Sequence, residues 1–128
     1  MNFDLLKNLE APKGKIDAVI DTDTFNEVDD QFALAYMIKS KEKINIRAIY
    51  AAPFYNVNSK SPKDGMEKSY DEIMRILDYA DASELKEIVH KGAERYLPDE
   101  KTWVESDAAK NLIELARQYS PEKPVLCF

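Results

Sequence analysis

The sequence has little cysteine and histidine, and it has no long apolar run. Its 128 residues include a single cysteine, Cys127, which excludes an internal disulfide and is typical of a reducing compartment. No stretch reaches the length of a membrane span, and residues 1–15 carry charges among their leucines, so they lack the apolar core of a signal peptide. These absences predict a cytoplasmic protein with no membrane partner.

Positive charge is also scarce. The chain has 18 Lys and Arg against 24 Asp and Glu, which gives a net charge of −6. No segment combines clustered basic residues with aromatic ones, and an acidic chain repels phosphate, so we expect no nucleic-acid partner. The length is sufficient for one domain.

Negative charge, in contrast, is concentrated in one segment. Residues 21–30 place five acidic side chains within ten residues, directly after the apolar run 16–20. Two carboxylates about 4 Å apart repel by about 4 kcal/mol at an effective dielectric constant of about 20, so such a cluster favours a bound cation. The apolar run predicts a buried strand, and open α/β sheets bind ligands at the carboxyl ends of their strands.

Capping of the following helix accounts for two of these acids at most. We expect Glu27 to face solvent and Asp21 to accept hydrogen bonds from neighbouring backbone N–H groups. Asp23, Asp29 and Asp30 then remain as candidate metal ligands. They offer hard oxygen atoms with no Cys or His nearby, which favours calcium or magnesium over zinc.

The rest of the chain alternates between short apolar segments and longer segments of helical periodicity. We predict strands at 16–20, 44–52, 87–90 and 124–128, and helices at 28–39, at 66–80 and from Ser106 or Asp107 to Pro121; residues 85–89 could instead extend a helix from Ser83. This order predicts an α/β fold, an open and mostly parallel sheet with flanking helices.

Each predicted helix has an apolar stripe that we expect to pack on the sheet. The stripes are Val28, Phe32, Ala35 and Tyr36 in the first helix, Met66, Tyr70, Ile73, Leu77 and Ala80 in the second, and Ala109, Leu112, Ile113 and Ala116 in the third. The same reasoning assigns Met37, Met66 and Met74 to the core and a structural role to His90. Tyr96 and Trp103 are expected to bury surface, with a place beside a nucleobase as the alternative.

The last predicted strand ends with the chain itself. Domain boundaries usually fall in polar linkers, whereas residues 124–128 are apolar. We therefore expect residues 1–128 to be the N-terminal portion of a single, truncated α/β domain, with little activity on its own.

A polar loop is predicted between the second strand and the second helix. Residues 53–65 include Asn56 and Asn58 and leave the same sheet edge as the acidic segment. Long loops at that edge often carry function, and either asparagine is a candidate for the site.

Two short motifs carry a resemblance to a known family. The run Val19-Ile20-Asp21-Thr22-Asp23, followed by Asp29-Asp30-Gln31-Phe32-Ala33-Leu34, resembles the N-terminal signature of the inosine-uridine-preferring nucleoside hydrolases. Five residues separate Asp23 from the Asp pair, against three in the usual family turn. This longer turn is similar to that of a subgroup with an Asn-Glu-x-Asp-Asp element.

The resemblance implies a Rossmann-like domain of the nucleoside hydrolase type that binds Ca²⁺ and hydrolyses the N-glycosidic bond of ribonucleosides. It implies that Asp23 binds calcium and accepts a proton from the attacking water, and that Asp30 is a bidentate calcium ligand. Asp29 would hold a ribose hydroxyl, and a further substrate contact would come from Asn26, Asn56 or Asn58. A homo-oligomer is a further expectation.

Two other functions fit parts of the same pattern. A haloacid-dehalogenase-like phosphatase also begins with Asp-x-Asp after a buried strand and would use Asp21 as nucleophile with magnesium. That family favours a small β-branched residue where Phe25 stands and does not need Asp29 and Asp30. The other alternative is a fragment that binds a cation or nucleoside without catalysis.

Overall fold

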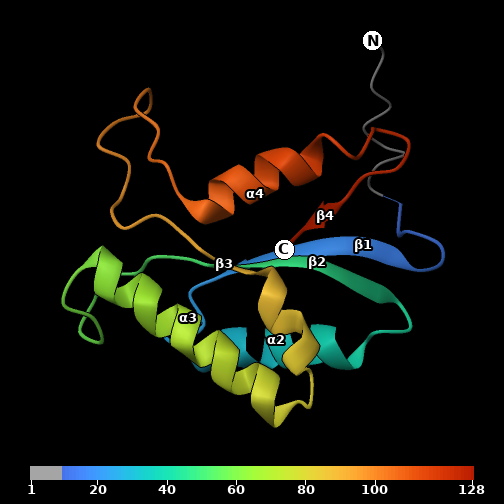
Figure 1. Cartoon of the computed structure of the whole chain (residues 1–128), viewed down its shortest axis with the longest axis horizontal. Coiled ribbons are helices and arrows are strands. Elements are labelled where there is room, and N and C mark those ends of the chain that lie inside the picture. The colour runs from blue at the N-terminus through green and yellow to red at the C-terminus, as the bar shows by residue number, and fades with distance from the viewer. Residues whose placement is uncertain (1–9) are drawn as a thin grey trace.

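The computed structural model describes residues 10–128 and contains a four-stranded parallel sheet (Figure 1). The sheet order is β3-β2-β1-β4, with β1 at Ile16–Thr22, β2 at Ile44–Ala51, β3 at Val89–Lys91 and β4 at Leu126–Cys127. The helices are α2 at Val28–Lys39, α3 at Pro62–Tyr79 and α4 at Asp107–Ala116, with a 3-10 helix, η1, at Ser83–Ile88. The expected open parallel sheet with flanking helices is therefore confirmed.

Helices cover both faces of the sheet, with α2 and α3 on one side and α4 on the other (Figure 1). Side chains alternate along β1, so Ala18 and Ile20 join the core beneath α2 and α3, whereas Val19 joins the core beneath α4. This two-sided burial explains why the strands appear in the sequence as nearly continuous apolar runs.

The predicted face of α2 is wrong. Leu34, Met37 and Ile38 are buried, whereas Phe32 is 71% exposed and Tyr36 is 72% exposed. Both stripes follow the spacing of three to four residues that brings side chains to one face of a helix, so periodicity alone could not choose between them. In the structure, the stripe of Leu34, Met37 and Ile38 shares the core with residues of β1 and β2.

The predicted stripe of α4 is also displaced. Ala108 and Leu115 are the buried residues and Leu112 packs beside them, whereas Ile113 is 55% exposed. The stripe of α3 is confirmed, because Met66, Ile73 and Leu77 are buried and Tyr70, Met74 and Ala80 pack against the same core; Met37 and Met66 are core residues as expected.

Several element boundaries differ from the prediction. Helix α3 begins at Pro62 rather than at residue 66, because Ser61 Oγ accepts a hydrogen bond from the Asp64 N–H and proline suits the first helical turn. The first half of the predicted third strand, residues 87–88, belongs to the 3-10 helix η1, and β3 itself covers Val89–Lys91.

Two further expectations concern aromatic side chains and the ends of the chain. Tyr96 is 53% exposed and Trp103 is 73% exposed, so the expectation that they bury surface is wrong.

Residues 1–9, which belong to the segment predicted to lack a signal peptide, lie outside the described residues. Among the described helices, none is both long and apolar enough to cross a membrane.

The corrected face of α2 leads to a direct test. Leu34→Ala should lower the free energy of unfolding by about 2–5 kcal/mol, because it opens a cavity in the core. Phe32→Ala on the same helix should change it by about 0.5 kcal/mol or less, because the ring is exposed. Urea denaturation of both variants measures the difference, and equal losses would contradict the observed orientation of α2.

Candidate functional site

The acidic segment and the polar loop meet at the carboxyl edge of the sheet. β1 and β2 are parallel and, after a register shift at Ala18, pair up to Thr22 and Ala51, so the segments that follow both strands leave from the same edge. The Ala52 N–H donates to the Thr22 carbonyl over 2.9 Å, which extends the pairing by one residue. Asp23 follows Thr22 directly and is held at this edge.

Asp23 lies among side chains that could share a ligand with it. Its carboxylate accepts a hydrogen bond from Asn26 Nδ2 over 3.0 Å, and the Asn26 N–H closes the turn onto the Asp23 carbonyl over 2.6 Å. The pKa of Asp23 is raised to about 6, first by burial and then by its hydrogen-bond contact with the Asp30 carboxyl. The two carboxyls therefore lie close together.

The polar loop contributes Asn56 to this group. Asn56 Nδ2 donates to Asn26 Oδ1 over 2.5 Å, which links the loop after β2 to the turn after β1. The backbone N–H of Asn58 instead donates to Asn56 Oδ1 over 2.8 Å. Of the two candidate asparagines, the structure thus brings the side chain of Asn56 to Asn26, while Asn58 orients it through the backbone.

A comparison with known families matches this arrangement. The profile of the family described as "Cellulose-binding Sde182, nucleoside hydrolase-like domain" covers residues 18–127, which include the whole acidic segment and the polar loop. The chain belongs to this family. No curated protein and no solved structure matches the chain. The resemblance to nucleoside hydrolases is confirmed at the level of this nucleoside hydrolase-like domain.

The other acids of the segment differ from the pair in their surroundings: Glu27 is exposed, although its charge also raises the pKa of Asp23. Asp29 is exposed in the first turn of α2, and its side chain makes no hydrogen bond to the described residues. Asp21 does not show the expected hydrogen bonds to backbone N–H groups among these residues; its own N–H donates to the Phe128 carbonyl over 2.8 Å. Although the Asp21 residue is exposed overall, the protein packed around its carboxyl raises its pKa by burial.

Contacts that the sequence did not predict hold the turn and loop in place. The hydroxyl groups of Thr22 and Thr24 are hydrogen-bonded over 3.0 Å, and both residues are buried. The rings of Phe25 and Phe54 stack with centroids 6.5 Å apart. A Cβ at Gly65 would lie 2.0 Å from the Phe54 carbonyl oxygen, so only glycine lets α3 approach the loop this closely.

His90 lies outside this group, in agreement with the structural role predicted for it. It is half-buried on β3, where its register partner on β2 is Tyr50 and the two ring centroids are 6.0 Å apart. Burial lowers the pKa of His90, which favours the neutral ring. Tyr50 donates its hydroxyl hydrogen to Asn111 Oδ1 over 2.8 Å, so this row of residues ties the sheet to α4.

The donor chemistry of the site fits a hard cation. Asp23 and Asp30 offer carboxylate oxygens, which calcium prefers, while the amide oxygens of Asn26 and Asn56 each accept a hydrogen bond. Within residues 10–128, no group of three or more His, Cys, Asp or Glu side chains lies close enough to hold a metal. The pair of carboxylates is therefore the set of ligands that this part of the chain brings together.

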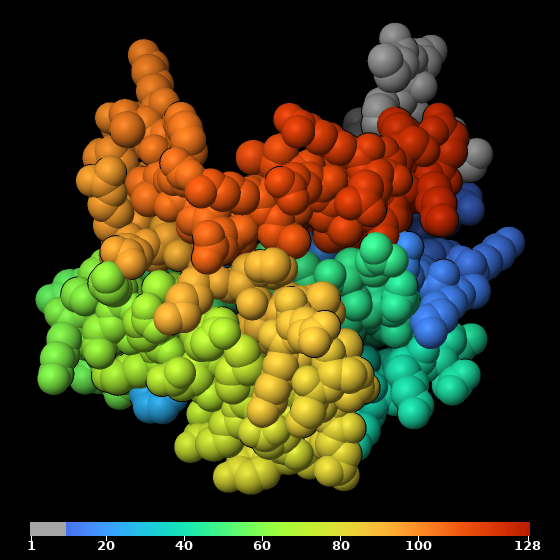
Figure 2. Space-filling view, in the orientation of Figure 1, coloured from blue at the N-terminus to red at the C-terminus, as the bar shows by residue number. Residues whose placement is uncertain are grey.

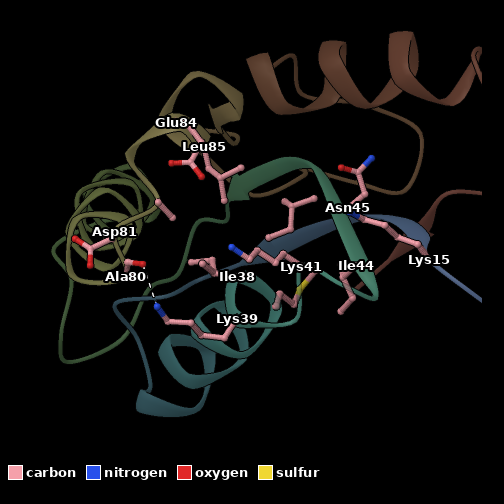
Figure 3. Close-up of a pocket in the computed structure, with 13 residues that line it drawn as sticks. Lys15, Ile38, Lys39, Lys41, Ile44, Asn45, Ala80, Asp81, Glu84 and Leu85 are labelled. Atoms are coloured by element: carbon pink, nitrogen blue, oxygen red, sulfur yellow. Dashed lines mark hydrogen bonds between the residues drawn. The ribbon is translucent and has the colours of Figure 1, made fainter.

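A separate pocket of about 220 Å³ lies at the opposite, amino edge of the sheet (Figure 3). Lys15, Lys39 and Lys41 surround it, and Lys39 Nζ donates to the Ala80 carbonyl over 3.1 Å. It contains none of the acids of the site, so its position does not support a role in the same chemistry.

The carboxyl pair predicts an unusual pH dependence of stability in the absence of metal. The pKa of Asp23 is higher in the folded chain, about 6, than the ordinary 3.8, so the folded state binds this proton more tightly. Its contribution to the free energy of unfolding therefore falls as the pH rises through this window. Asp23→Asn should remove that fall and stabilise the chain by about 1 kcal/mol at pH 7, a value reduced for solvent screening.

Denaturation in EDTA at pH 4.5 and pH 7 measures this effect. Asp71→Asn, at an exposed position of α3, is the matched control and should leave the pH dependence unchanged. A loss of stability at pH 7 in Asp23→Asn, as for a carboxylate that stabilises the fold, would contradict the repulsion between Asp23 and Asp30.

Proposed function

We propose that this nucleoside hydrolase-like domain takes part in the calcium-dependent hydrolysis of the N-glycosidic bond of ribonucleosides to ribose and free base. The observation that carries the proposal is the contact between the carboxyls of Asp23 and Asp30, with the Asn26 and Asn56 amides beside them at the carboxyl edge. Family membership supports the reaction class, because the matching domain is nucleoside hydrolase-like.

Asp23 and Asp30 are the residues that would hold the calcium ion. When bound, calcium supplies a positive charge that positions the ribose diol and makes a nearby water more acidic. The hard oxygen donors of this pair support that assignment, and the repulsion between them gives the pair a physical reason to bind a cation.

Asp23 is the candidate general base. Cleavage of an N-glycosidic bond passes through an oxocarbenium-like state, in which the attacking water must lose a proton. A carboxylate held beside the bound sugar can accept this proton, and general-base assistance contributes roughly 10²–10⁴-fold. The hydrogen bond from Asn26 over 3.0 Å fixes the orientation of the Asp23 carboxylate.

The remaining polar groups are assigned to the ribose. Asn56 is hydrogen-bonded to Asn26 and presents an amide at the same edge, so we assign to it a hydrogen bond with a ribose hydroxyl. Asp29 is exposed in the first turn of α2 and has both carboxylate oxygens available among the described residues, which suits a hydroxyl donor. Asn58 orients Asn56 and is not assigned a direct contact.

A test of this function measures release of reducing sugar from inosine or uridine, with calcium present, by a form of the protein that contains this domain and is active. Asp23→Asn should reduce the rate by about 10²-fold or more, because the water loses its proton acceptor, and removal of calcium with EDTA should have a similar effect. Asp71→Asn should retain the full rate. Hydrolysis of phosphate monoesters with no action on nucleosides would instead favour the phosphatase alternative.

A second candidate function is polysaccharide binding without hydrolysis. The family description contains the words "cellulose-binding", and the segment between β3 and α4 stands out from the body of the molecule in Figure 2. In that segment, Tyr96 and Trp103 are exposed, and flat aromatic rings with a polar edge offer suitable surfaces for sugar rings.

This second candidate predicts sedimentation of the chain with microcrystalline cellulose. Trp103→Ala should reduce the bound fraction several-fold, because it removes the largest exposed ring of the segment. Tyr79→Ala, which removes an aromatic ring of similar exposure from α3, is the control and should bind like the unchanged chain. If all three proteins stay in the supernatant, the binding candidate is wrong.

A further inference from the structure

The outer face of α2 carries an exposed apolar stripe. Val28, Phe32 and Tyr36 follow one another at intervals of four residues and are 62%, 71% and 72% exposed. They lie opposite Leu34 and Met37, which anchor the helix to the core. Large apolar side chains that gather on one exposed helix face are typical of an interaction surface rather than of scattered surface residues.

The charges on this outer face are opposite at its two ends. A residue in an α-helix is rotated by about 100° from its neighbour, so Asp29 and Lys39 fall on the same outer half of α2 as Phe32 and Tyr36. Asp29 lies in the first turn and Lys39 in the last. Lys39 Nζ is held by the Ala80 carbonyl over 3.1 Å, which uses one of its three N–H donors.

We propose that α2 pairs with α2 of a second copy of the chain, antiparallel and about a two-fold axis. With the axis at the level of Leu34, Phe32 of each copy lies opposite Tyr36 of the other. The same register places each Asp29 opposite the Lys39 of the other copy. One surface thereby complements itself in both shape and charge, which is the requirement of an isologous dimer.

The expected size of the interface sets its strength. Four aromatic rings and two valines would bury roughly 700–1,000 Å² of surface, since an aromatic side chain buries about 150–250 Å². Stable complexes bury about 1,200–2,000 Å² or more, so the pair should be a reversible dimer rather than a permanent one. Antiparallel helix dipoles favour the same arrangement. The proposal is independent of the proposed function.

Analytical ultracentrifugation over a range of protein concentrations tests the dimer. The unchanged chain should move from the mass of a monomer to that of a dimer as the concentration rises. Phe32→Glu should remain monomeric, because it places a charge at the centre of the apolar stripe. Tyr79→Glu, at an exposed aromatic residue of α3, should dimerise like the unchanged chain.

Charge reversal tests the register. Asp29→Lys and Lys39→Asp alone should each weaken the dimer about fivefold or more, because each brings like charges together twice. The double variant restores opposite charges across the axis and should recover most of the affinity. Circular dichroism checks that each variant is folded, and no nucleoside is present, because Asp29 is also assigned to ribose.

Three outcomes would overturn the proposal. The first is a chain that stays monomeric at every concentration, and the second is a dimer that Phe32→Glu does not affect. The third is a double charge variant that dimerises as weakly as the single variants, since this would exclude the antiparallel register of α2 on α2.

Discussion

The contact between the carboxyls of Asp23 and Asp30 is the constraint on which the candidate site depends. A buried strand fixes the position of the first carboxyl and the start of α2 fixes the second, so neither can move away without breaking the fold around it. The hydrogen bond from Asn26 offsets part of their repulsion, and a cation would offset more. Strand β1 and the start of α2, which hold the two carboxyls together, therefore favour the binding of a cation.

Features that depend on local patterns could be predicted from the sequence. The strands at β1 and β2 and the helix at α2 were predictable because an apolar run, an acidic turn and a helical period follow one another without interruption. The acidic pair was predictable for a related reason, since a strand that ends in a loop must place the next side chains at the sheet edge.

Features that depend on contacts between distant segments could not be predicted. Helix α2 is apolar on two sides, and only the shape of the sheet beneath it decides that Leu34 rather than Phe32 is buried. The choice between Asn56 and Asn58 depends on a hydrogen bond to Asn26, thirty residues away in the sequence. The packing of α3 against the preceding loop depends on the close approach of Gly65 to the Phe54 carbonyl, and no periodicity encodes that contact.

The two sides of α2 connect the site with the outer surface. Its inner side and its first turn hold Asp30 against Asp23, whereas its outer side presents Phe32 and Tyr36 to solvent. Leu34, Met37 and Ile38 anchor the helix to the core, so the outer residues stay exposed while the first turn stays at the site. One helix therefore serves both surfaces, because the residues that fix it against the sheet separate the carboxyl at its first turn from the aromatic rings on its outer side.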